Sequence, residues 1–226
     1  MPASTTSCAA SLTVKAVLFD FDGTFADTAP DLAAAVNRMR TKRGLTPLDA
    51  ATARPYASMG ARGLLRVGFG IAPEHPDYVA LRDEFLERYA EAVCVETRLF
   101  PGMAALLEAL GRRAIPWGIV TNKAARFTQS IVPRLGVAPA CIVCGDSTAH
   151  LKPHPAPLLL AAEQLRLDPA DCLYVGDDLR DVQAARAAGM RSAAVEYGYH
   201  GTDTDGPRAW HADIVISQPQ ELLEHL

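Results

Sequence analysis

An apolar run near the start of this chain ends in two carboxylates. Residues 14–19 are strand-forming and, apart from Lys15, apolar, and Asp20 and Asp22 follow directly with Gly23 behind them. A strand that is apolar on both faces is typical of the centre of a parallel sheet, and ligands of open α/β sheets bind beyond the carboxyl ends of the strands. Two carboxylates at that point therefore predict a site for a hard cation and for covalent chemistry.

Short apolar runs of the same kind recur later in the chain, at residues 116–121, 141–144, 172–176, 192–195 and 213–216. Helical patterns alternate with them, at residues 101–110, 123–135, 157–167 and 178–188. Gly189 suits the C-cap of the last of these helices. Alternating strands and helices form right-handed β-α-β units. The sequence therefore predicts an α/β fold with a doubly wound parallel sheet.

Residues 26–98 interrupt this alternation, because they contain helical patterns and turns but no convincing strand. The helical patterns lie at residues 31–43, 60–69 and 77–93. An interval of this length is too long for a plain loop. We expect a small helical cap domain at 26–98, inserted into a core domain made of residues 13–25 and 99–226. Residues 1–12 are predicted to be a disordered tail.

Composition excludes several classes of function. The net charge of the 226 residues is −4, whereas nucleic-acid binding needs a basic face. No apolar run approaches the roughly 20 residues that span a bilayer, and residues 1–11 lack the cationic and apolar segments of a secretory signal. We therefore expect no nucleic-acid partner, no membrane and a cytoplasmic location. The sequence does not distinguish a monomer from a homodimer.

The five cysteines suggest no disulfide framework, which favours a reducing compartment. Cys141 and Cys144 have C-x-x-C spacing. A zinc site needs about four ligands and no second pair exists, so we interpret both as buried thiols.

Polar residues follow four of the predicted strands, at ends that can lie on one edge of a parallel sheet. Their pattern comprises D-x-D-G-T at 20–24, Thr121, Lys152 and G-D-x-x-x-D at 176–181. In this order they resemble the motifs of the haloacid dehalogenase-like superfamily, and the resemblance covers nearly the whole chain after residue 12. The helical insertion matches the subclass whose cap lies between the first and second motifs.

The first motif suits phosphoryl transfer. Asp20 is the predicted nucleophile, whose attack on phosphorus would give an aspartyl-phosphate. Asp22 would protonate the leaving oxygen and then deprotonate the attacking water. Gly23 allows a sharp turn with no Cβ in the way, and we expect the hydroxyl of Thr24 to hold Asp22.

A phosphate dianion that approaches these carboxylates needs a cation, and Mg²⁺ prefers oxygen ligands. The resemblance implies that the ligands are the carboxylate of Asp20, the backbone carbonyl of Asp22 and Asp177. It also implies that Asp181 orients a metal-bound water.

Three further residues complete the predicted phosphate site. Lys152 would pair with Asp20 and the phosphate. Thr121, together with backbone N–H groups where Asn122 opens a helix, would hold phosphate oxygens. His150 and His154, which flank the lysine, are interpreted as turn residues rather than ligands.

The second acid of the first motif distinguishes branches of the superfamily. The dehalogenase branch lacks an Asp at the position of Asp22, so the chain is expected to act on phosphate. Residues 20–32 resemble phosphoglycolate phosphatases, where Leu is usual at the position of Phe25. Other stretches look closer to the N-acetylmuramic acid 6-phosphate phosphatases of peptidoglycan recycling. Arg62, in the predicted cap, is a candidate to bind the carboxylate that both substrates carry.

Two alternatives remain open from the sequence. A sugar-phosphate mutase of the same superfamily keeps both acids of the first motif. A receiver-like signalling module uses a similar set of residues, although its paired acids are usually adjacent and the chain is about twice the length of one such domain. The prediction that we favour is a Mg²⁺-dependent phosphatase acting on a small phosphorylated metabolite.

Overall fold

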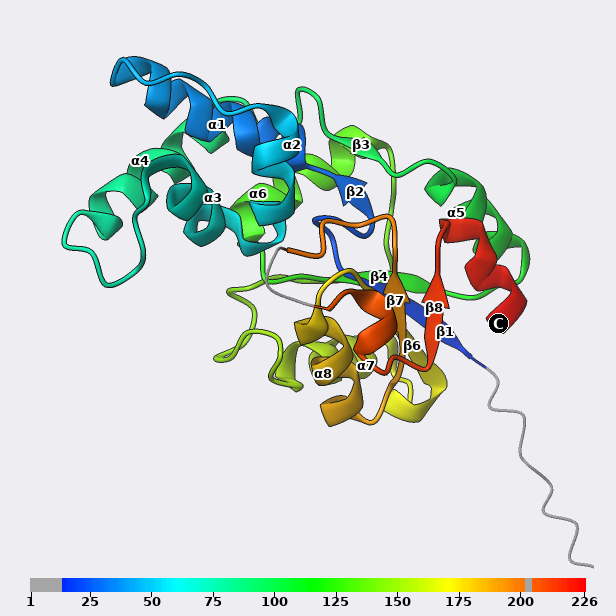
Figure 1. Cartoon of the computed structure of the whole chain (residues 1–226). Helices are drawn as coiled ribbons and strands as arrows, with labels where there is room; N and C mark the ends of the chain where they lie inside the picture. Colours follow the sequence, from blue (N-terminus) through cyan, green and yellow to red (C-terminus); the bar gives the residue numbers. More distant parts are fainter. Residues whose placement is uncertain (1–13, 202–204) are drawn as a thin grey trace, which may run out of the picture.

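A computed structural model describes residues 14–201 and 205–226 of the chain. Its centre is a sheet of six parallel strands in the order β5-β4-β1-β6-β7-β8 (Figure 1). The strands are β1 (Ala16–Phe19), β4 (Trp117–Val120), β5 (Cys141–Val143), β6 (Cys172–Gly176), β7 (Arg191–Val195) and β8 (Ile214–Ile216). The predicted doubly wound parallel sheet is confirmed. The predicted tail at residues 1–12 lies outside the described residues.

The sheet winds in both directions from its first strand. The chain passes from β1 to β4 and β5 on one side and then to β6, β7 and β8 on the other. The crevice at such a reversal is where open α/β sheets bind their ligands. The acidic end of β1 therefore lies at the switch point of the sheet.

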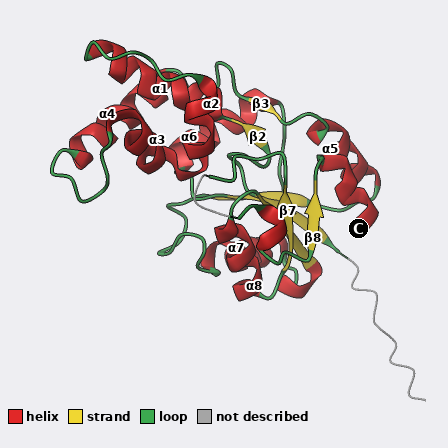
Figure 2. Cartoon of the chain, in the orientation of Figure 1, coloured by secondary structure: helices red, strands yellow, loops and turns green. Residues whose placement is uncertain are grey.

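Helices cover both faces of the sheet (Figure 2). They are α5 (Met103–Arg112), α6 (Ala125–Ile131), α7 (Ala156–Leu165) and α8 (Leu179–Ala188), and Gly189 ends α8 in the left-handed conformation, as predicted. Val17 and Phe19 pack in the cluster of α5 and α6, whereas Ala16 and Leu18 pack in that of α7 and α8. Cys141 and Cys144 are free and buried. Burial raises the pKa of the Cys141 thiol to about 11.

A second group of helices comes between β1 and β4 in the sequence. It consists of α1 (Ala29–Lys42), α2 (Ala50–Ala53), α3 (Gly60–Phe69) and α4 (Tyr78–Glu91), with a 3₁₀ helix at Arg54–Met59. Figure 1 shows these helices beyond the ends toward which the strand arrows point. The predicted helices at 31–43, 60–69 and 77–93 correspond to α1, α3 and α4. We call this group the cap; the domain boundaries at 25/26 and 98/99 stay a prediction.

A two-stranded antiparallel pair joins the places where the chain enters and leaves the cap. Its strands are β2 (Ala26–Asp27) and β3 (Arg98–Leu99). The sequence did not predict it, because two residues are too few to show a strand period. Asp31 adds a second link, since its buried carboxylate accepts hydrogen bonds from the N–H groups of residues 95–97 and from the Thr97 hydroxyl. The β2–β3 pair and the hydrogen bonds of Asp31 therefore hold the two ends of the cap together.

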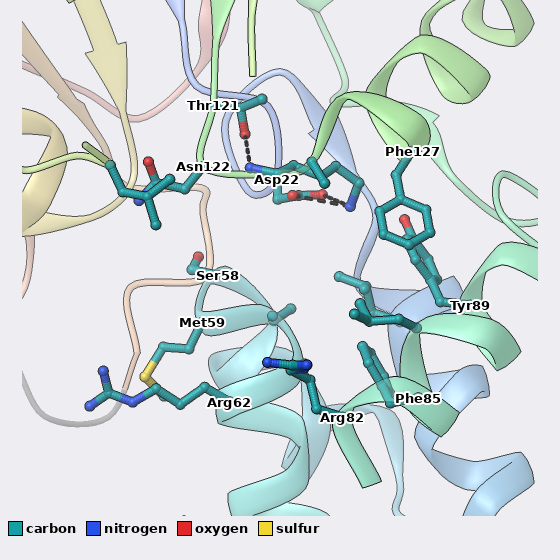
Figure 3. Close-up of a pocket in the computed structure, with 18 of the residues that line it drawn as sticks. Asp22, Ser58, Met59, Arg62, Arg82, Phe85, Tyr89, Thr121, Asn122 and Phe127 are labelled. Atoms are coloured by element: carbon teal, nitrogen blue, oxygen red, sulfur yellow. Dashed lines mark hydrogen bonds and ion pairs between the residues drawn. The ribbon is translucent and has the colours of Figure 1, made fainter. Parts of the chain in front are cut away.

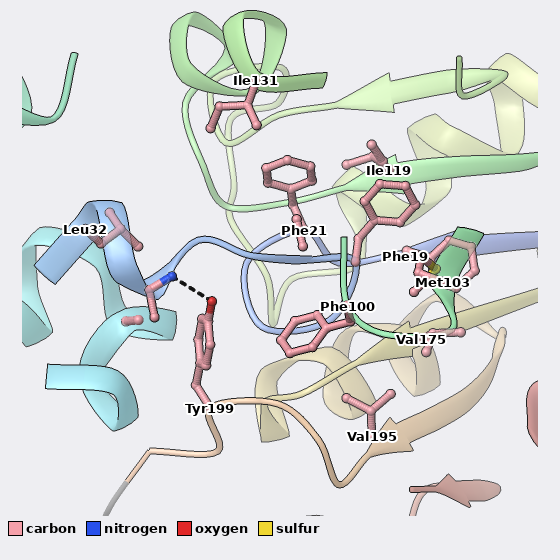
Figure 4. Close-up of a cluster of buried hydrophobic side chains, with 14 of the residues drawn as sticks. Phe19, Phe21, Leu32, Phe100, Met103, Ile119, Ile131, Val175, Val195 and Tyr199 are labelled. Carbon is pink, nitrogen blue, oxygen red and sulfur yellow. Dashed lines mark hydrogen bonds between the residues drawn. The ribbon is translucent and has the colours of Figure 1, made fainter. Parts of the chain in front are cut away.

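An aromatic cluster holds the loop that follows β1 (Figure 4). Phe21 and Phe25 are fully buried, with ring centroids 6.0 Å apart, and Phe25 stacks on Trp117 at 5.3 Å. The backbone N–H groups of Phe25 and Ala26 both donate to the carbonyl of Phe21. Packing on this scale leaves the acids of the loop little freedom to move.

The helices within the described ranges are too short or too polar to cross a membrane.

Candidate active site

Four segments that are distant in the sequence converge at the carboxyl edge of the sheet. Asp20 follows β1, Thr121 follows β4 and Asp177 follows β6. Lys152 reaches the same place from the segment before α7: its Nζ lies 2.8 Å from Asp20 Oδ1 and 2.8 Å from Asp181 Oδ1. The structure thus brings together the acids and the lysine that the sequence singled out.

Lys152 is buried and stays charged. Its Nζ also donates to the hydroxyl of Tyr174 (2.7 Å) and to the carbonyl of Val120 (3.2 Å). Burial lowers the pKa of the ammonium, but the charges of Asp181 and Asp20 outweigh burial and raise it overall. The side chain therefore provides a fixed positive charge beside Asp20.

Asn122 does not open a helix, because α6 begins only at Ala125. Its side-chain amide is bound to the backbone of Lys152: Nδ2 donates to the carbonyl (3.0 Å) and Oδ1 accepts from the N–H (2.9 Å). These two hydrogen bonds hold the segment that contains Lys152 against the end of β4. Thr121, which is 3 % exposed, lines the adjacent cavity.

Three acids form a cluster suited to a cation. Asp20, Asp177 and Asp181 each offer a carboxylate oxygen, and these oxygens all lie within 4.8 Å of one another. Burial, with the charges of Asp20 and Asp181, raises the pKa of Asp177 to about 8. Burial likewise raises the pKa of Asp181 to about 6, although Lys152 opposes the shift. Three buried carboxylates with one ammonium leave uncompensated negative charge, which a divalent ion would neutralise.

The orientation of Asp177 is set by residues from three parts of the chain. Thr24 Oγ1 donates to Oδ1 (3.0 Å), and the backbone N–H of Tyr199 and the hydroxyl of Ser58 both donate to Oδ2 (2.9 Å each). The expected bond from Thr24 to Asp22 was therefore wrong. Gly23 has φ of +90°, and a Cβ there would collide with the Asp177 carboxylate, so a residue other than glycine would be strained and crowded.

Asp22 is held instead by Thr28 and Lys123. The Thr28 hydroxyl donates to Oδ1, and Lys123 Nζ lies 3.0 Å from Oδ1 and 3.2 Å from Oδ2. The same ammonium lies 4.6 Å from the ring centroid of Tyr89, on α4. Burial lowers the pKa of Lys123 but Asp22 and Tyr89 raise it overall. Lys123 was not predicted from the sequence, although its position directly after Thr121 and Asn122 was a usable signal.

The cap closes over these groups and leaves a cavity of about 500 Å³ between cap and core. Ser58 contacts Asp177 from the cap side, and its carbonyl accepts a hydrogen bond from Arg180 of the core (3.1 Å). Arg62, the predicted cap residue, lines the cavity. Figure 3 shows it on the side of the cavity opposite Asp22.

Tyr199, which was likewise not predicted from the sequence, links the acid cluster to the cap. Its hydroxyl accepts hydrogen bonds from the N–H groups of Thr28 (2.7 Å) and Ala29 (2.9 Å), where α1 begins, and donates to Asp27 (2.9 Å) (Figure 4). Its own N–H donates to Asp177. One residue thus bridges a candidate metal ligand and the entry to the cap.

The family model described as "Haloacid dehalogenase-like hydrolase" matches residues 17–195. The chain is 45 % identical over 215 residues to an N-acetylmuramic acid 6-phosphate phosphatase of Pseudomonas aeruginosa, covering 94 % of this chain and 95 % of the relative. It is 45 % identical over 215 residues to a phosphoglycolate phosphatase of Xanthomonas campestris pv. campestris, covering 93 % and 95 %.

A solved structure is also similar. The crystal structure of a predicted phosphoglycolate phosphatase from Haemophilus somnus superposes with a TM-score of 0.81 at 26 % identity, covering 93 % of this chain and 96 % of that one.

Proposed function

This chain belongs to the haloacid dehalogenase-like hydrolase family, and we propose that it is a Mg²⁺-dependent phosphatase that forms an aspartyl-phosphate on Asp20. The observation that carries the proposal is the position of Lys152, whose Nζ lies 2.8 Å from both Asp20 and Asp181. Lys152 thus places a buried positive charge beside Asp20, where a phosphate dianion has to be bound.

Asp20 and Asp22 have separate roles in the proposed reaction. The Asp20 carboxylate attacks phosphorus, and the ester bond to the leaving oxygen breaks. Asp22 gives that oxygen a proton and later removes one from the water that hydrolyses the aspartyl-phosphate. Lys123 and Thr28 hold Asp22 in place, while Lys152 and Thr121 bind phosphate oxygens.

The acid cluster fits a divalent cation. Asp20 Oδ1 is buried, and its contact with Lys152 is an ion pair without the geometry of a hydrogen bond, so the oxygen retains lone pairs for a ligand. Asp20, Asp177 and the backbone carbonyl of Asp22 would hold Mg²⁺, with Asp181 beside it. When bound, the ion supplies the positive charge that lets a phosphate dianion approach two carboxylates.

The relatives' names suggest two substrates, 2-phosphoglycolate and N-acetylmuramic acid 6-phosphate, which share this chemistry and differ in the leaving group. Both are small metabolites expected in the cytoplasm. The cysteines at 94, 141, 144 and 172 are free thiols, which suits a reducing compartment.

The test is release of inorganic phosphate from p-nitrophenyl phosphate and from both candidate substrates, with Mg²⁺ and with EDTA. We expect release with Mg²⁺ only, and none from the Asp20→Asn protein. Asp171→Asn is the matched control, because Asp171 pairs with Lys15 at the opposite end of the sheet, and it should remain active. Appreciable turnover by Asp20→Asn would contradict the assignment of the nucleophile. Isomerised sugar phosphate without free phosphate would indicate a mutase.

A further inference from the structure

The cavity has more room and more positive charge than hydrolysis of a phosphate ester requires. Its volume of about 500 Å³ lies within the range that holds drug-sized ligands and far exceeds what a two-carbon phosphate ester fills. If the chain is the phosphatase proposed above, this spare room indicates the chemical class of the leaving group.

Helix α4 presents a stripe of side chains to the cavity. Tyr78, Arg82, Phe85, Leu86 and Tyr89 all line it, at the spacing of one helix face. Arg82 is the one charged residue in this stripe. Its carboxylate partner, Asp83 at 2.7 Å, is an exposed neighbour in the sequence, and such pairs contribute little. Arg82 therefore remains able to bind an anion in the cavity.

Two more arginines line the cavity without a carboxylate partner. Within the described residues, Arg62 makes no hydrogen bond or ion pair, and Arg126 contacts only the ring of Phe127, at 4.5 Å. The cations nearer the acids are all paired. Lys123 lies 3.0 Å from Asp22, Lys152 lies 2.8 Å from Asp20 and Arg180 lies 2.8 Å from Asp178.

The charge of the cavity wall is thus unevenly distributed. Asp20 and Asp22 are the only acids among its described lining residues, and both have a lysine partner. The guanidinium groups of Arg62 and Arg126 are exposed at the edge of the cavity, and a carboxylate that binds there would gain charge-assisted hydrogen bonds.

We propose that Arg62, Arg82 and Arg126 form an anion-binding rim. In this proposal the substrate is a phosphate monoester of sugar size whose leaving group carries a carboxylate remote from the phosphorus. The rim would make these arginines specificity-determining residues.

Two of the three arginines, Arg62 and Arg82, lie away from the place where the phosphate would react. Figure 3 shows Arg62 and Arg82 on the side of the cavity opposite Asp22 and Thr121, with Phe85 beside Arg82. The carboxylate of 2-phosphoglycolate is only one carbon removed from the ester oxygen, so it stays near the phosphorus. A sugar ring would cross the cavity, and its apolar face would pack on the aromatic wall.

The decisive comparison uses two sugar phosphates that differ in one group. N-acetylmuramic acid 6-phosphate carries a carboxylate on an ether side chain, and N-acetylglucosamine 6-phosphate lacks that side chain. We expect the protein to prefer the carboxylate-bearing ester by about ten-fold or more in kcat/KM, and to prefer it over 2-phosphoglycolate. Arg82→Ala and Arg126→Ala should each reduce the preference, mainly through KM.

Arg112→Ala is the matched control. Arg112 is an exposed arginine at the end of α5, 3.9 Å from Glu108, and does not line the cavity, so its loss should leave the preference intact. Equal kcat/KM for the two sugar phosphates in the wild-type protein would overturn the inference. The inference would also be overturned if the arginine variants lowered kcat/KM equally for both sugar phosphates, or if the wild-type protein preferred 2-phosphoglycolate.

A binding measurement separates this inference from the proposed function. Titration calorimetry of the Asp20→Asn protein with the two sugar phosphates measures recognition of the carboxylate without turnover. Tighter binding of the carboxylate-bearing sugar, lost in Asp20→Asn/Arg82→Ala, supports the rim even if no ester is hydrolysed. Equal binding of both sugars contradicts the rim even if phosphate is released from each.

Discussion

Replacing Lys152 with Met tests how the buried charges of the site are balanced. Methionine keeps an unbranched apolar side chain but removes the ammonium, which lies 2.8 Å from Asp20 and 2.8 Å from Asp181 and is 4 % exposed. Removing one partner from a buried charge pair, such as Lys152 from its hydrogen bond with Asp181, costs about 3–5 kcal/mol. We expect a loss of this size in the free energy of unfolding at pH 8 without metal.

The loss should depend on pH in a defined direction. Burial raises the pKa of Asp181 to about 6 while Lys152 opposes the shift, so below pH 6 Asp181 is largely neutral already in the wild-type protein. The ammonium then has fewer charges to compensate. Lys152→Met should therefore cost less stability at pH 5 than at pH 8.

Urea unfolding in EDTA at the two pH values measures both effects. Lys15→Met is the control, because Lys15 also lies 2.8 Å from its partner, Asp171, but its side chain is 57 % exposed. An exposed pair is screened by solvent, so the control should unfold like the wild-type protein. If Lys15→Met were as destabilising as Lys152→Met, or if the latter lost less at pH 8 than at pH 5, the reasoning from burial would be refuted.

Three further predictions concern the framework of the site. Asp31→Asn should lower the free energy of unfolding by about 1–3 kcal/mol, because the backbone N–H groups of residues 95–97 lose a charged acceptor; a change within error in urea unfolding would contradict this. Phe25→Ala should cost about 3–5 kcal/mol and Phe25→Leu about 1.5 kcal/mol or less, since the fully buried ring packs on Trp117; equal losses would argue against that packing. Burial and neighbouring acids raise the pKa of Asp177 to about 8 from an ordinary value of 3.8, so the metal-free folded state holds a proton that the unfolded chain releases. Its free energy of unfolding should therefore fall as pH rises from about 4 to 8, and saturating Mg²⁺ should abolish the fall in thermal melts; a fall that persists in Mg²⁺ would argue against a cation at Asp177.

Several parts of the fold were predictable because they depend on short stretches of sequence. Each of the six apolar runs became a strand, and α3 lies where its helical pattern predicted it. The β2–β3 pair was not predictable in this way, because its two-residue strands exist only where the two ends of the cap meet.

The partners of individual side chains show where local reasoning ends. Thr24 is two residues from Asp22, yet its hydroxyl donates to Asp177. Asn122 binds the backbone of Lys152 instead of opening a helix. Sequence distance does not decide which acceptor a short side chain reaches, because tertiary packing brings other acceptors just as close.

The sequence by itself determined which residues stand at the ends of the strands, because an apolar run followed by an acid is a local pattern and parallel strands share one carboxyl edge. Only the tertiary structure decided how the cap contributes. The Ser58 hydroxyl donates to Asp177, the ring of Tyr89 lies against the ammonium of Lys123, and Arg82 lines the cavity. These placements depend on how one group of helices packs against a distant sheet. That packing is the sum of many weak, long-range contacts, which no short segment of the chain encodes.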